Sequence, residues 1–401
     1  MAPYSSRSRI VIAFDTFMLS REYRNSGTYV YGTQLLKQFG RLLEGRNGLS
    51  VRPFVLSSQA DEAGGSENCS ALEPALTRGL RYRRLWRLGG ATIEALRVHA
   101  DLLFSPSVHV TPLRLVPVVT TIHDVMPAIL PPDLVPGSRV LNALTRVSAK
   151  LSHRILTDSL NSKNDLVEIY GVPPDKIKVV YIGYDRDLFS TRPANPVSLV
   201  DLLNRFGIHR PYLIHHGTVH PRKNLVRLIQ AYCLLLTRRP DIDMPLVLAG
   251  PLGWRHELIQ AEAAKLPQRA QVIFTGALAD EGLSVLVKGA DLCIIPSLYE
   301  GFCLPLVEAM ACGTPTIASR ASCIPEVSGG CLRYFDPHSV DEMACLMEEV
   351  VDDSDLRTDL STKGSRRATD FSWERCAAET LSELAEVAGV SWAHPSTETV
   401  C

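Results

Sequence analysis

Two glutamates eight positions apart stand where the chain passes from a predicted strand into a predicted helix. The stretch SLYEGFCLPLVEAMACGTP covers residues 297–315 and contains Glu300 and Glu308. The preceding DLCIIPS is apolar enough for a buried strand, and Pro305 suits the first turn of a helix, where its missing N–H costs nothing. We therefore expect a helix from residue 304 that is closed by Gly313, with Glu308 in its first turn and Glu300 on the loop before it.

This arrangement is suited to a ligand that carries both phosphate and sugar. Backbone N–H groups of residues 301–304 and the start of a helix form a site that favours negative charge, as phosphates require. Carboxylates beside such a site have another use, because they accept hydrogen bonds from sugar hydroxyls. The structural alternative is a Glu308 that stabilises the helix start and a Glu300 that is solvated.

Two further loops carry residues that suit the same ligand. HHGTVHPRKNL, residues 215–225, follows a predicted strand, and its Arg222 and Lys223 could neutralise a departing diphosphate without a metal. TIHDVMP places His123 at another strand end. Taken alone, two adjacent basic residues are usually solvated and a lone histidine is usually structural, so the function of each depends on its neighbours.

The glutamate stretch resembles a known family of enzymes. YEGFCLPLVEAMACGTPTIAS is similar to the E-x7-E motif of retaining glycosyltransferases with the GT-B fold, specifically family 4, which includes many bacterial mannosyl-, glucosyl- and rhamnosyltransferases. The resemblance implies that Glu308 binds the ribose hydroxyls of a nucleotide and that Glu300 faces the transferred sugar. It also implies that the loop after Glu300 contacts the sugar through Gly301, Phe302, Cys303 and Leu304.

The other loops extend this resemblance to residues from about 10 to 388. HHGTVHPRKNL resembles the G-x-x-x-x-R-K-N segment of the family, which implies that Gly217, Arg222 and Lys223 hold the pyrophosphate. TIHDVMP resembles the H-D step, which implies that His123 hydrogen-bonds the donor sugar near its reacting carbon. Asp124 is expected to orient His123 or the loop.

Several positions depart from the family pattern. NSGTYVYGTQLL resembles the G-G-I-G-R-Y loop, whose glycines let the backbone approach the diphosphate, but only Gly27 is kept, and Ser26 and Tyr29 replace glycines. Cys303 also stands where the family commonly has glycine, and its side chain is expected to point toward the donor sugar or to narrow its pocket. GPLGW, residues 250–254, matches a loop near the nucleotide base, although a Gly-Pro turn explains it equally well.

A repeating sequence pattern predicts the strands and helices that position these loops. Short apolar runs alternate with helical patterns, which is typical of parallel βαβ units. A Pro-punctuated stretch, DLFSTRPANPVSLVD, interrupts the rhythm and reads as a linker between domains. The predicted strands are RIVIAF, VRPFVL, DLLFS, PVVTTI, RILTD, KVVYIGYD, PYLIHHG, MPLVLAG, QVIFTG and DLCIIPS, and the predicted helices include residues 29–43, 225–239, 255–266 and 282–288.

The predicted fold class is therefore α/β, of the GT-B type, with two Rossmann-like doubly wound parallel-sheet domains facing across a cleft. We expect an acceptor-binding domain over 1–190 and a nucleotide-sugar-binding domain over 191–371. A helix over about 372–390 should cross back to the first domain with Trp373 as a packing anchor, and 391–401 should be a flexible tail. A cleft between the carboxyl ends of two such sheets is the expected ligand site.

The composition narrows the class of protein. A chain of 401 residues is about right for two domains. The formal net charge of −1 gives no overall reason to bind nucleic acid, and the absence of a signal peptide core or membrane span predicts a cytoplasmic protein. The ten cysteines include no C-x-x-C pair, so most, such as Cys233, Cys293 and Cys345, are expected to be reduced core residues.

Two sequence features have competing explanations. The segment TRGLRYRRLWRLGGATIEALR is basic and amphipathic over residues 78–97, so it fits either a peripheral membrane contact or a packed helix with solvated arginines. Asp241-Ile-Asp243 and Asp185-Arg-Asp187 imitate a D-x-D metal motif, but both lie where turns favour aspartate. No P-loop, dinucleotide or esterase motif is present in the sequence.

The resemblance implies a retaining hexosyltransferase that needs no cofactor and no metal. The donor would be a nucleoside diphosphate sugar, with GDP-mannose as the leading candidate because it is frequent in the family. The acceptor would be a hydroxyl of a growing polysaccharide or of a lipid-linked glycan at the inner face of the membrane. Two alternatives are a catalytically impaired nucleotide-sugar-binding regulatory protein and a GT-B epimerase or phosphorylase.

Overall fold

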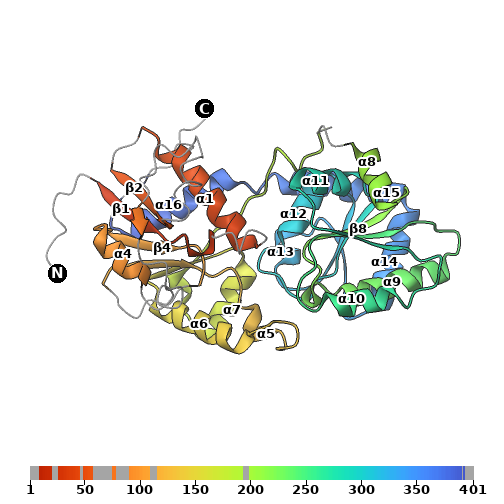
Figure 1. Ribbon diagram of the computed structural model, residues 1–401, viewed down its shortest axis with the longest axis horizontal. Coiled ribbons are helices and arrows are strands. Elements are labelled where there is room, and N and C mark those ends of the chain that lie inside the picture. The colour runs from red at the N-terminus through yellow and green to blue at the C-terminus, as the bar shows by residue number, and fades with distance from the viewer. Residues whose placement is uncertain are drawn as a thin grey trace. The chain divides into compact units, whose positions relative to one another are not determined.

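The chain divides into two compact units. The computed structural model describes residues 9–19, 26–45, 48–56, 75–77, 90–108, 115–192, 198–390 and 392. Unit 1 comprises Met1–Ala128, Gly137–Gly183 and Trp373–Cys401, and unit 2 comprises Ile129–Pro136 and Tyr184–Ser372. Each unit contains one parallel sheet with helices on it (Figure 1).

Unit 1 is built on a seven-stranded parallel sheet with the order β3-β2-β1-β4-β5-β6-β7. Strand β1 pairs with β2 on one side and with β4, the central strand, on the other. Every residue of β4 and β5 is buried, as expected of strands that are covered on both faces. The strands are β1 (Ile10–Phe14), β2 (Leu49–Leu56), β3 (Ala75–Thr77), β4 (Leu102–Ser105), β5 (Val118–Thr121), β6 (Arg154–Thr157) and β7 (Ile177–Val179).

The helices of unit 1 include one from the end of the chain. Helix α16 packs on α1, and the two lie side by side in Figure 1. Trp373 at the start of α16 is 4% exposed, with its ring centroid 6.3 Å from that of Tyr31 on α1, so it is a packing anchor as predicted. The helices are α1 (Gly27–Leu43), α4 (Ala91–Arg97), α5 (Met126–Ile129), α6 (Ser138–Leu151), α7 (Leu160–Tyr170) and α16 (Trp373–Val387).

Unit 2 repeats the architecture with six parallel strands in the order β10-β9-β8-β11-β12-β13. The chain moves outward from β8 to β10 on one side and then restarts at β11 on the other side of β8. This makes the ends of β8 and β11 the point where the direction of winding reverses. The strands are β8 (Leu213–His216), β9 (Leu246–Ala249), β10 (Val272–Gly276), β11 (Leu292–Ile295), β12 (Thr316–Ser319) and β13 (Arg333–Phe335).

Helices flank this second sheet on both sides (Figure 1). Helix α9 packs on α10 and α14, whereas α11 packs on α8 and α12. The helices are α8 (Leu199–Phe206), α9 (Leu225–Arg238), α10 (His256–Ala263), α11 (Asp280–Gly289), α12 (Leu304–Ala311), α13 (Ile324–Ser328), α14 (Val340–Asp352) and α15 (Ser354–Ala368). Two doubly wound parallel sheets, as the sequence rhythm predicted, are confirmed.

Two details of the prediction are wrong. Glu308 lies in the second turn of α12 and not in the first, because the helix begins at Leu304, as predicted, and its fifth residue is beyond the first turn of about 3.6 residues. Cys345 is exposed and not a core residue, because it lies on the outer side of α14, where Arg238 Nη1 is 3.1 Å from its sulfur. Cys293, in contrast, is buried on β11 as expected.

The aspartate pairs that imitate a metal motif hold local structure. Asp241 forms an ion pair with Arg239, and Asp185 Oδ1 accepts hydrogen bonds from the backbone N–H groups of Asp187 and Leu188. Within the described part of the chain, no His, Cys, Asp and Glu side chains group closely enough to hold a metal ion.

The structure describes only part of the basic segment that was predicted as a possible membrane contact. Residues 78–89 of the basic segment lie outside the described residues, and its remainder includes α4. On α4, Ile93 is exposed, whereas Arg97 forms an ion pair with Glu94. None of the helices in the described ranges combines the length and apolar character needed to cross a bilayer.

Candidate active site

The loops that follow β8 and β11 bring the predicted basic residues and glutamates of unit 2 together. Parallel strands at a reversal of winding leave a crevice at their carboxyl ends, where α/β proteins bind ligands. Arg222 and Lys223 come from the loop after β8, and Glu300 comes from the loop after β11. A backbone hydrogen bond of 3.0 Å from Leu298 N to Arg222 O ties the two loops together.

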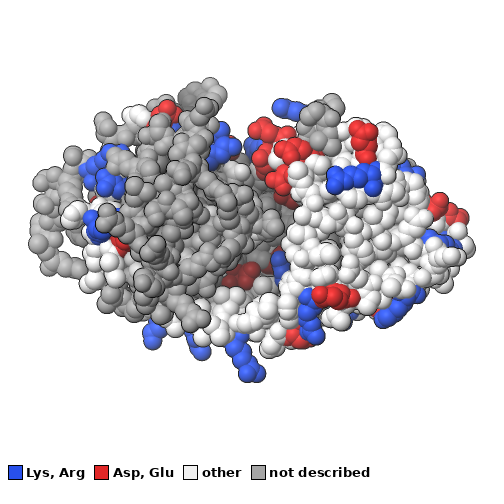
Figure 2. All heavy atoms as spheres, viewed as in Figure 1, with Lys and Arg blue, Asp and Glu red and all other residues white. Residues whose placement is uncertain are grey.

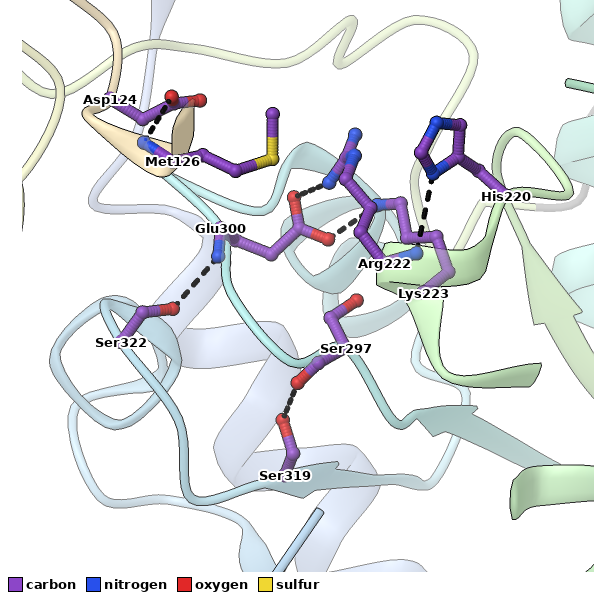
Figure 3. Close-up of polar contacts among 9 residues, drawn as sticks. All are labelled: Asp124, Met126, His220, Arg222, Lys223, Ser297, Glu300, Ser319 and Ser322. Atoms are coloured by element: carbon purple, nitrogen blue, oxygen red, sulfur yellow. Dashed lines mark hydrogen bonds and ion pairs between the residues drawn. The ribbon is translucent and has the colours of Figure 1, made fainter. Parts of the chain in front are cut away.

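Glu300 forms ion pairs with both neighbouring cations (Figure 3). Lys223 Nζ donates to Oε1 at 2.5 Å and Arg222 Nη1 donates to Oε2 at 2.9 Å. Glu300 is 7% exposed and Lys223 is 4% exposed, so little water competes for these contacts. The Glu300 backbone N–H donates to Ser322 Oγ at 2.9 Å, which fixes the loop on its other side.

The cations decide the charge of Glu300. Burial alone would raise the pKa of this carboxyl group, but Arg222 and Lys223 outweigh that effect and lower its pKa from 4.5 to about 2. Glu300 is therefore a carboxylate at neutral pH, already bound to two donors. A solvated Glu300, which was the structural alternative, is excluded by its burial.

A short 3-10 turn presents the two cations. The turn covers Pro221–Lys223, and it ends at Asn224, whose φ of 60° lies in the left-handed region that asparagine tolerates. Asn224 Nδ2 donates to Pro296 O at 3.1 Å and to Pro337 O at 2.7 Å, and the side chain is buried. Asn224, the last residue of the R-K-N segment, therefore holds the loop of residues 217–224 against the end of β11. This loop carries Arg222 and Lys223 and is called the cation loop.

Two glycines allow another loop to press on the cation loop. A Cβ atom on Gly250, whose φ is 151°, would lie 2.2 Å from Gly217 O, which is closer than any real Cβ contact. The Gly217 N–H also donates to Ala249 O at 2.9 Å. The Gly-Pro turn of GPLGW thus has a structural role, because it supports the strand end that leads to Arg222 and Lys223.

Glu308 contacts a histidine of the neighbouring strand. Its Oε2 lies 3.1 Å from Nε2 of His216, the last residue of β8. The Glu308 side chain is 14% exposed, whereas that of His216 is 1% exposed. Glu308 thus reaches the surface of the site from α12, held on one side by a buried partner.

Cys303 adopts a conformation that explains why glycine is common at this position in the family pattern. Its φ is 67° and its ψ is 62°, in the left-handed region, and it is the N-cap of α12. The residue is only 4% exposed, and burial raises the pKa of its thiol to about 12. The thiol stays protonated at neutral pH and fills space beside Glu300.

His123 is held firmly within unit 1. Its Nδ1 lies 2.7 Å from Asp158 Oδ2, its Nε2 lies 3.1 Å from Pro106 O, and its ring packs edge-on against Tyr31. Burial would lower the pKa of His123, but Asp158, Asp124 and the carbonyl of Pro106 together outweigh burial and raise it. The predicted hydrogen bond to a sugar therefore has competitors, since both ring nitrogens already have protein acceptors. Asp124 holds the loop by accepting from Met126 N at 2.9 Å.

The start of α1 explains one departure from the family pattern. Ser26 is the N-cap of α1, and its hydroxyl accepts a hydrogen bond from Tyr29 N at 3.2 Å. Gly27 is the first residue of the helix, and within the described ranges no atom lies within 4 Å of the position that its Cβ would take. The role of Gly27 beside a diphosphate stays a prediction.

Comparison with known proteins identifies the family. Residues 205–367 match the model of Glycosyl transferases group 1, and residues 52–188 match that of Glycosyltransferase Family 4. O-antigen chain mannosyltransferase B of Escherichia coli is 30% identical over 293 residues, which are 72% of this chain and 75% of that protein. The chain belongs to the family 4 glycosyltransferases.

Other relatives of this glycosyltransferase match over shorter lengths. MMP alpha-(1->4)-mannosyltransferase of Mycolicibacterium hassiacum is 34% identical over 233 residues, which are 57% of this chain and 53% of that protein. The serotype-specific mannosyltransferase WbdA of Escherichia coli is 30% identical over 226 residues, only 27% of its length. The chain thus spans about half or less of these two relatives.

Solved structures confirm the GT-B fold. Anabaena Alr3699/HepE in complex with UDP and glucose superposes with a TM-score of 0.70 at 17% identity and covers 94% of this chain and 100% of that chain. WaaG, a glycosyltransferase involved in lipopolysaccharide biosynthesis, gives a TM-score of 0.67 at 18% identity over 92% of this chain and 98% of that chain.

Sequence reasoning missed four residues that contact or position the predicted site residues within their own units. Asn224 and Asp158 were visible as polar residues at the ends of recognised segments, and their positions could have been used. His216 and Ser322 gave no signal, because each contacts a glutamate that is distant in the sequence. The residues predicted for the site fall in both units, with Gly27 and His123 in unit 1 and the others in unit 2.

Proposed function

We propose that the protein is a retaining, metal-independent hexosyltransferase that moves a sugar from a nucleoside diphosphate sugar to a hydroxyl of a growing polysaccharide or lipid-linked glycan. The observation that carries this proposal is the Arg222–Glu300–Lys223 cluster at the reversal point of the unit 2 sheet, in which Glu300 and Lys223 are buried. GDP-mannose is the proposed donor, and the names of the mannosyltransferase relatives support a mannosyl group.

The cluster is suited to exchange one anion for another. Without a ligand, Glu300 contacts both Lys223 and Arg222 but balances only one of their two positive charges. The pyrophosphate of a donor would bring about two negative charges to the same cations and would compete with Glu300 for their N–H groups. The displaced carboxylate would then be available to accept hydrogen bonds from the hydroxyls of the transferred sugar.

The same cluster argues for catalysis by charge stabilisation. The bond between the anomeric carbon and the phosphate oxygen breaks, and negative charge grows on the diphosphate where Lys223 and Arg222 would hold it. The acceptor oxygen bonds to the anomeric carbon on the face that the diphosphate leaves, and its proton passes to the leaving phosphate oxygen. Anomeric configuration is thereby retained. Because the pKa of Glu300 is about 2, this carboxylate is a weak base, which favours a positioning role for it.

Metal independence follows from the source of positive charge in this proposal. The two cations supply the charge that a divalent ion supplies in enzymes with D-x-D motifs. His123 of unit 1 is proposed to approach the donor sugar as a fixed imidazolium, because both of its nitrogens donate to acceptors, Asp158 Oδ2 and Pro106 O.

A lipid-linked acceptor would require contact with the inner face of a membrane, and α6 of unit 1 is suited to it. The helix sequence, SRVLNALTRVSAKL, contains three basic residues and no acidic residue. Val140 is 67% exposed and Val147 is 42% exposed. A shallow groove of about 350 Å³ is lined by Arg139, Val140, Ala143, Leu144 and Val147.

The charge of this face indicates the kind of surface that it would meet. Basic side chains project from the edge of unit 1 along which α6 lies (Figure 2). Exposed valines between basic residues match an anionic lipid surface, where apolar groups enter the interface and cations meet headgroups. We therefore propose α6 as a second candidate for the peripheral contact, beside the basic segment over residues 78–97.

Thermal-shift measurements against nucleoside diphosphates and their sugars test the proposed function. We expect a stabilisation of several degrees by one nucleoside diphosphate without added metal, and the largest effect for a guanosine compound. Turnover with saccharide acceptors would follow, with the anomeric configuration of the product read by NMR. Absence of binding to every compound would refute the proposal, and donor binding without transfer or hydrolysis would support the regulatory alternative.

A further inference from the structure

The partner of Glu308 is a buried histidine with no place in the roles above. His216 ends β8, and its side chain is 1% exposed. Its Nε2 lies 3.1 Å from Glu308 Oε2. Because a carboxylate has no hydrogen to donate, this contact requires the hydrogen to be on Nε2 of His216.

The other ring nitrogen faces a cysteine. Cys293 Sγ, on the neighbouring strand β11, lies 4.0 Å from His216 Nδ1, and Cys293 is fully buried. Burial raises the pKa of the Cys293 thiol far above its ordinary value, so the thiol keeps its hydrogen. A weak S–H donor beside Nδ1 leaves that nitrogen as an acceptor and agrees with a hydrogen on Nε2.

The contact with His216 involves only one carboxylate oxygen of Glu308, which is Oε2. Among the described residues, Oε2 has a protein partner at hydrogen-bond distance, whereas none is recorded for Oε1. A carboxylate that is fixed at one oxygen has few orientations for the second one, so less conformational freedom is lost when a ligand binds there.

Building on the proposed function, we infer that His216 is a positioning residue that holds Glu308 by Oε2 and presents Oε1 to the ribose hydroxyls of the donor. The site would therefore select ribonucleotides over deoxyribonucleotides through a residue that does not itself touch the nucleotide. His216 also precedes Gly217 in the chain, so the same strand end supports both the ribose contact and the cation loop.

The matched test compares His216→Gln with His216→Met. The two side chains have similar length, but only glutamine carries an N–H that can reach Glu308. Calorimetry would measure the affinity of each full-length protein for GDP and for 2′-deoxy- and 3′-deoxy-GDP. We expect the wild type to prefer GDP over at least one deoxy analogue by about 10- to 100-fold, as loss of a hydrogen bond to a charged group predicts.

His216→Met should lower that preference to less than about 3-fold by weakening GDP binding while deoxy-GDP binding stays unchanged, and His216→Gln should restore most of it. A purely structural histidine would instead weaken all three ligands equally, and thermal unfolding of each variant reports its folding. If a folded His216→Met variant kept the full preference for ribose, this inference would be overturned, but the proposed function would not. Failure of the wild type to bind any nucleoside diphosphate would overturn the proposed function and the inference with it.

Discussion

Lys223 Nζ lies 2.5 Å from Glu300 Oε1, and this contact is buried on both sides. The cation that is proposed to receive the diphosphate is thus already bound to a carboxylate of the same unit. Arg222 repeats the relationship at the second carboxylate oxygen, 2.9 Å away. If the proposed function holds, Glu300 would therefore compete with the diphosphate for these cations, which distinguishes its expected effect on binding from that of Glu308.

Substitutions at the two glutamates should change nucleotide affinity in opposite directions. Glu300→Gln removes the competing charge, so we expect the affinity for a nucleoside diphosphate to rise about 10-fold while sugar transfer falls by at least 100-fold. Glu308→Gln removes a proposed ribose contact, so affinity should fall about 10-fold. Calorimetry with the same nucleotide measures both. Weaker binding in Glu300→Gln would contradict the proposed competition.

Lys223→Ala should remove most of the catalytic activity. Loss of one preorganised donor to a developing negative charge typically reduces kcat by about 100- to 1,000-fold. We expect a loss of this size in steady-state transfer assays. Lys363→Ala, at an exposed lysine of α15 in the same unit, is the matched control and should keep the rate within about 2-fold. Wild-type rates in Lys223→Ala would refute the diphosphate role.

Acid should weaken unit 2 through Glu300. The pKa of Glu300 is about 2 in the folded protein and 4.5 ordinarily, so its ion pairs stabilise the fold above pH 4.5, and this contribution is lost as the pH falls toward 2. A shift of this size corresponds to about 3 kcal/mol. Urea unfolding of the wild type and of Glu300→Gln between pH 5 and pH 2 measures it. We expect the wild type to lose more stability than the variant, and parallel pH profiles would show that Glu300 does not carry this effect.

The sequence was sufficient to predict which strands carry the site. Apolar runs such as PYLIHHG and DLCIIPS became β8 and β11, because continuous hydrophobic segments need burial on both faces of a parallel sheet. The motif spacing then identified Glu300, Arg222 and Lys223. The serine that replaces a family glycine could also have been explained, because Ser26 before a helical pattern is a common N-cap.

The sequence could not predict side-chain contacts between residues that lie on different elements and far apart in the chain. His216 and Glu308 are 92 positions apart, and their contact depends on β8 lying beside β11. The charge partners of Glu300 depend likewise on how the 3-10 turn at Pro221 aims two side chains. Glu308 was misplaced by one turn although the helix start at residue 304 was predicted correctly, because a turn holds about 3.6 residues and Glu308 is the fifth residue of α12.

Helix α6 should bind anionic lipid surfaces. Vesicles that contain phosphatidylglycerol should co-sediment with the wild type, and vesicles of phosphatidylcholine alone should not, because the helix carries only positive charges. The double variant Val140→Ser and Val147→Ser should lower the bound fraction several-fold, since it removes two exposed apolar side chains. Val200→Ser, at an exposed valine of α8, is the control. Equal binding by both variants would exclude α6 as the contact.

Gly250→Ala should disrupt the loop that carries the cations. The added Cβ would lie 2.2 Å from Gly217 O and 2.7 Å from Gly217 C, so backbone must move to admit it. We expect a loss of about 2 to 4 kcal/mol in unfolding free energy and weaker nucleotide binding, because Gly217 leads to Arg222 and Lys223. The matched control is Gly276→Ala, which also has a positive φ of 69° but open space around the new Cβ. It should cost only about 1 to 2 kcal/mol and leave nucleotide affinity unchanged. Equal effects of the two substitutions would show that the contact with Gly217 does not support the site.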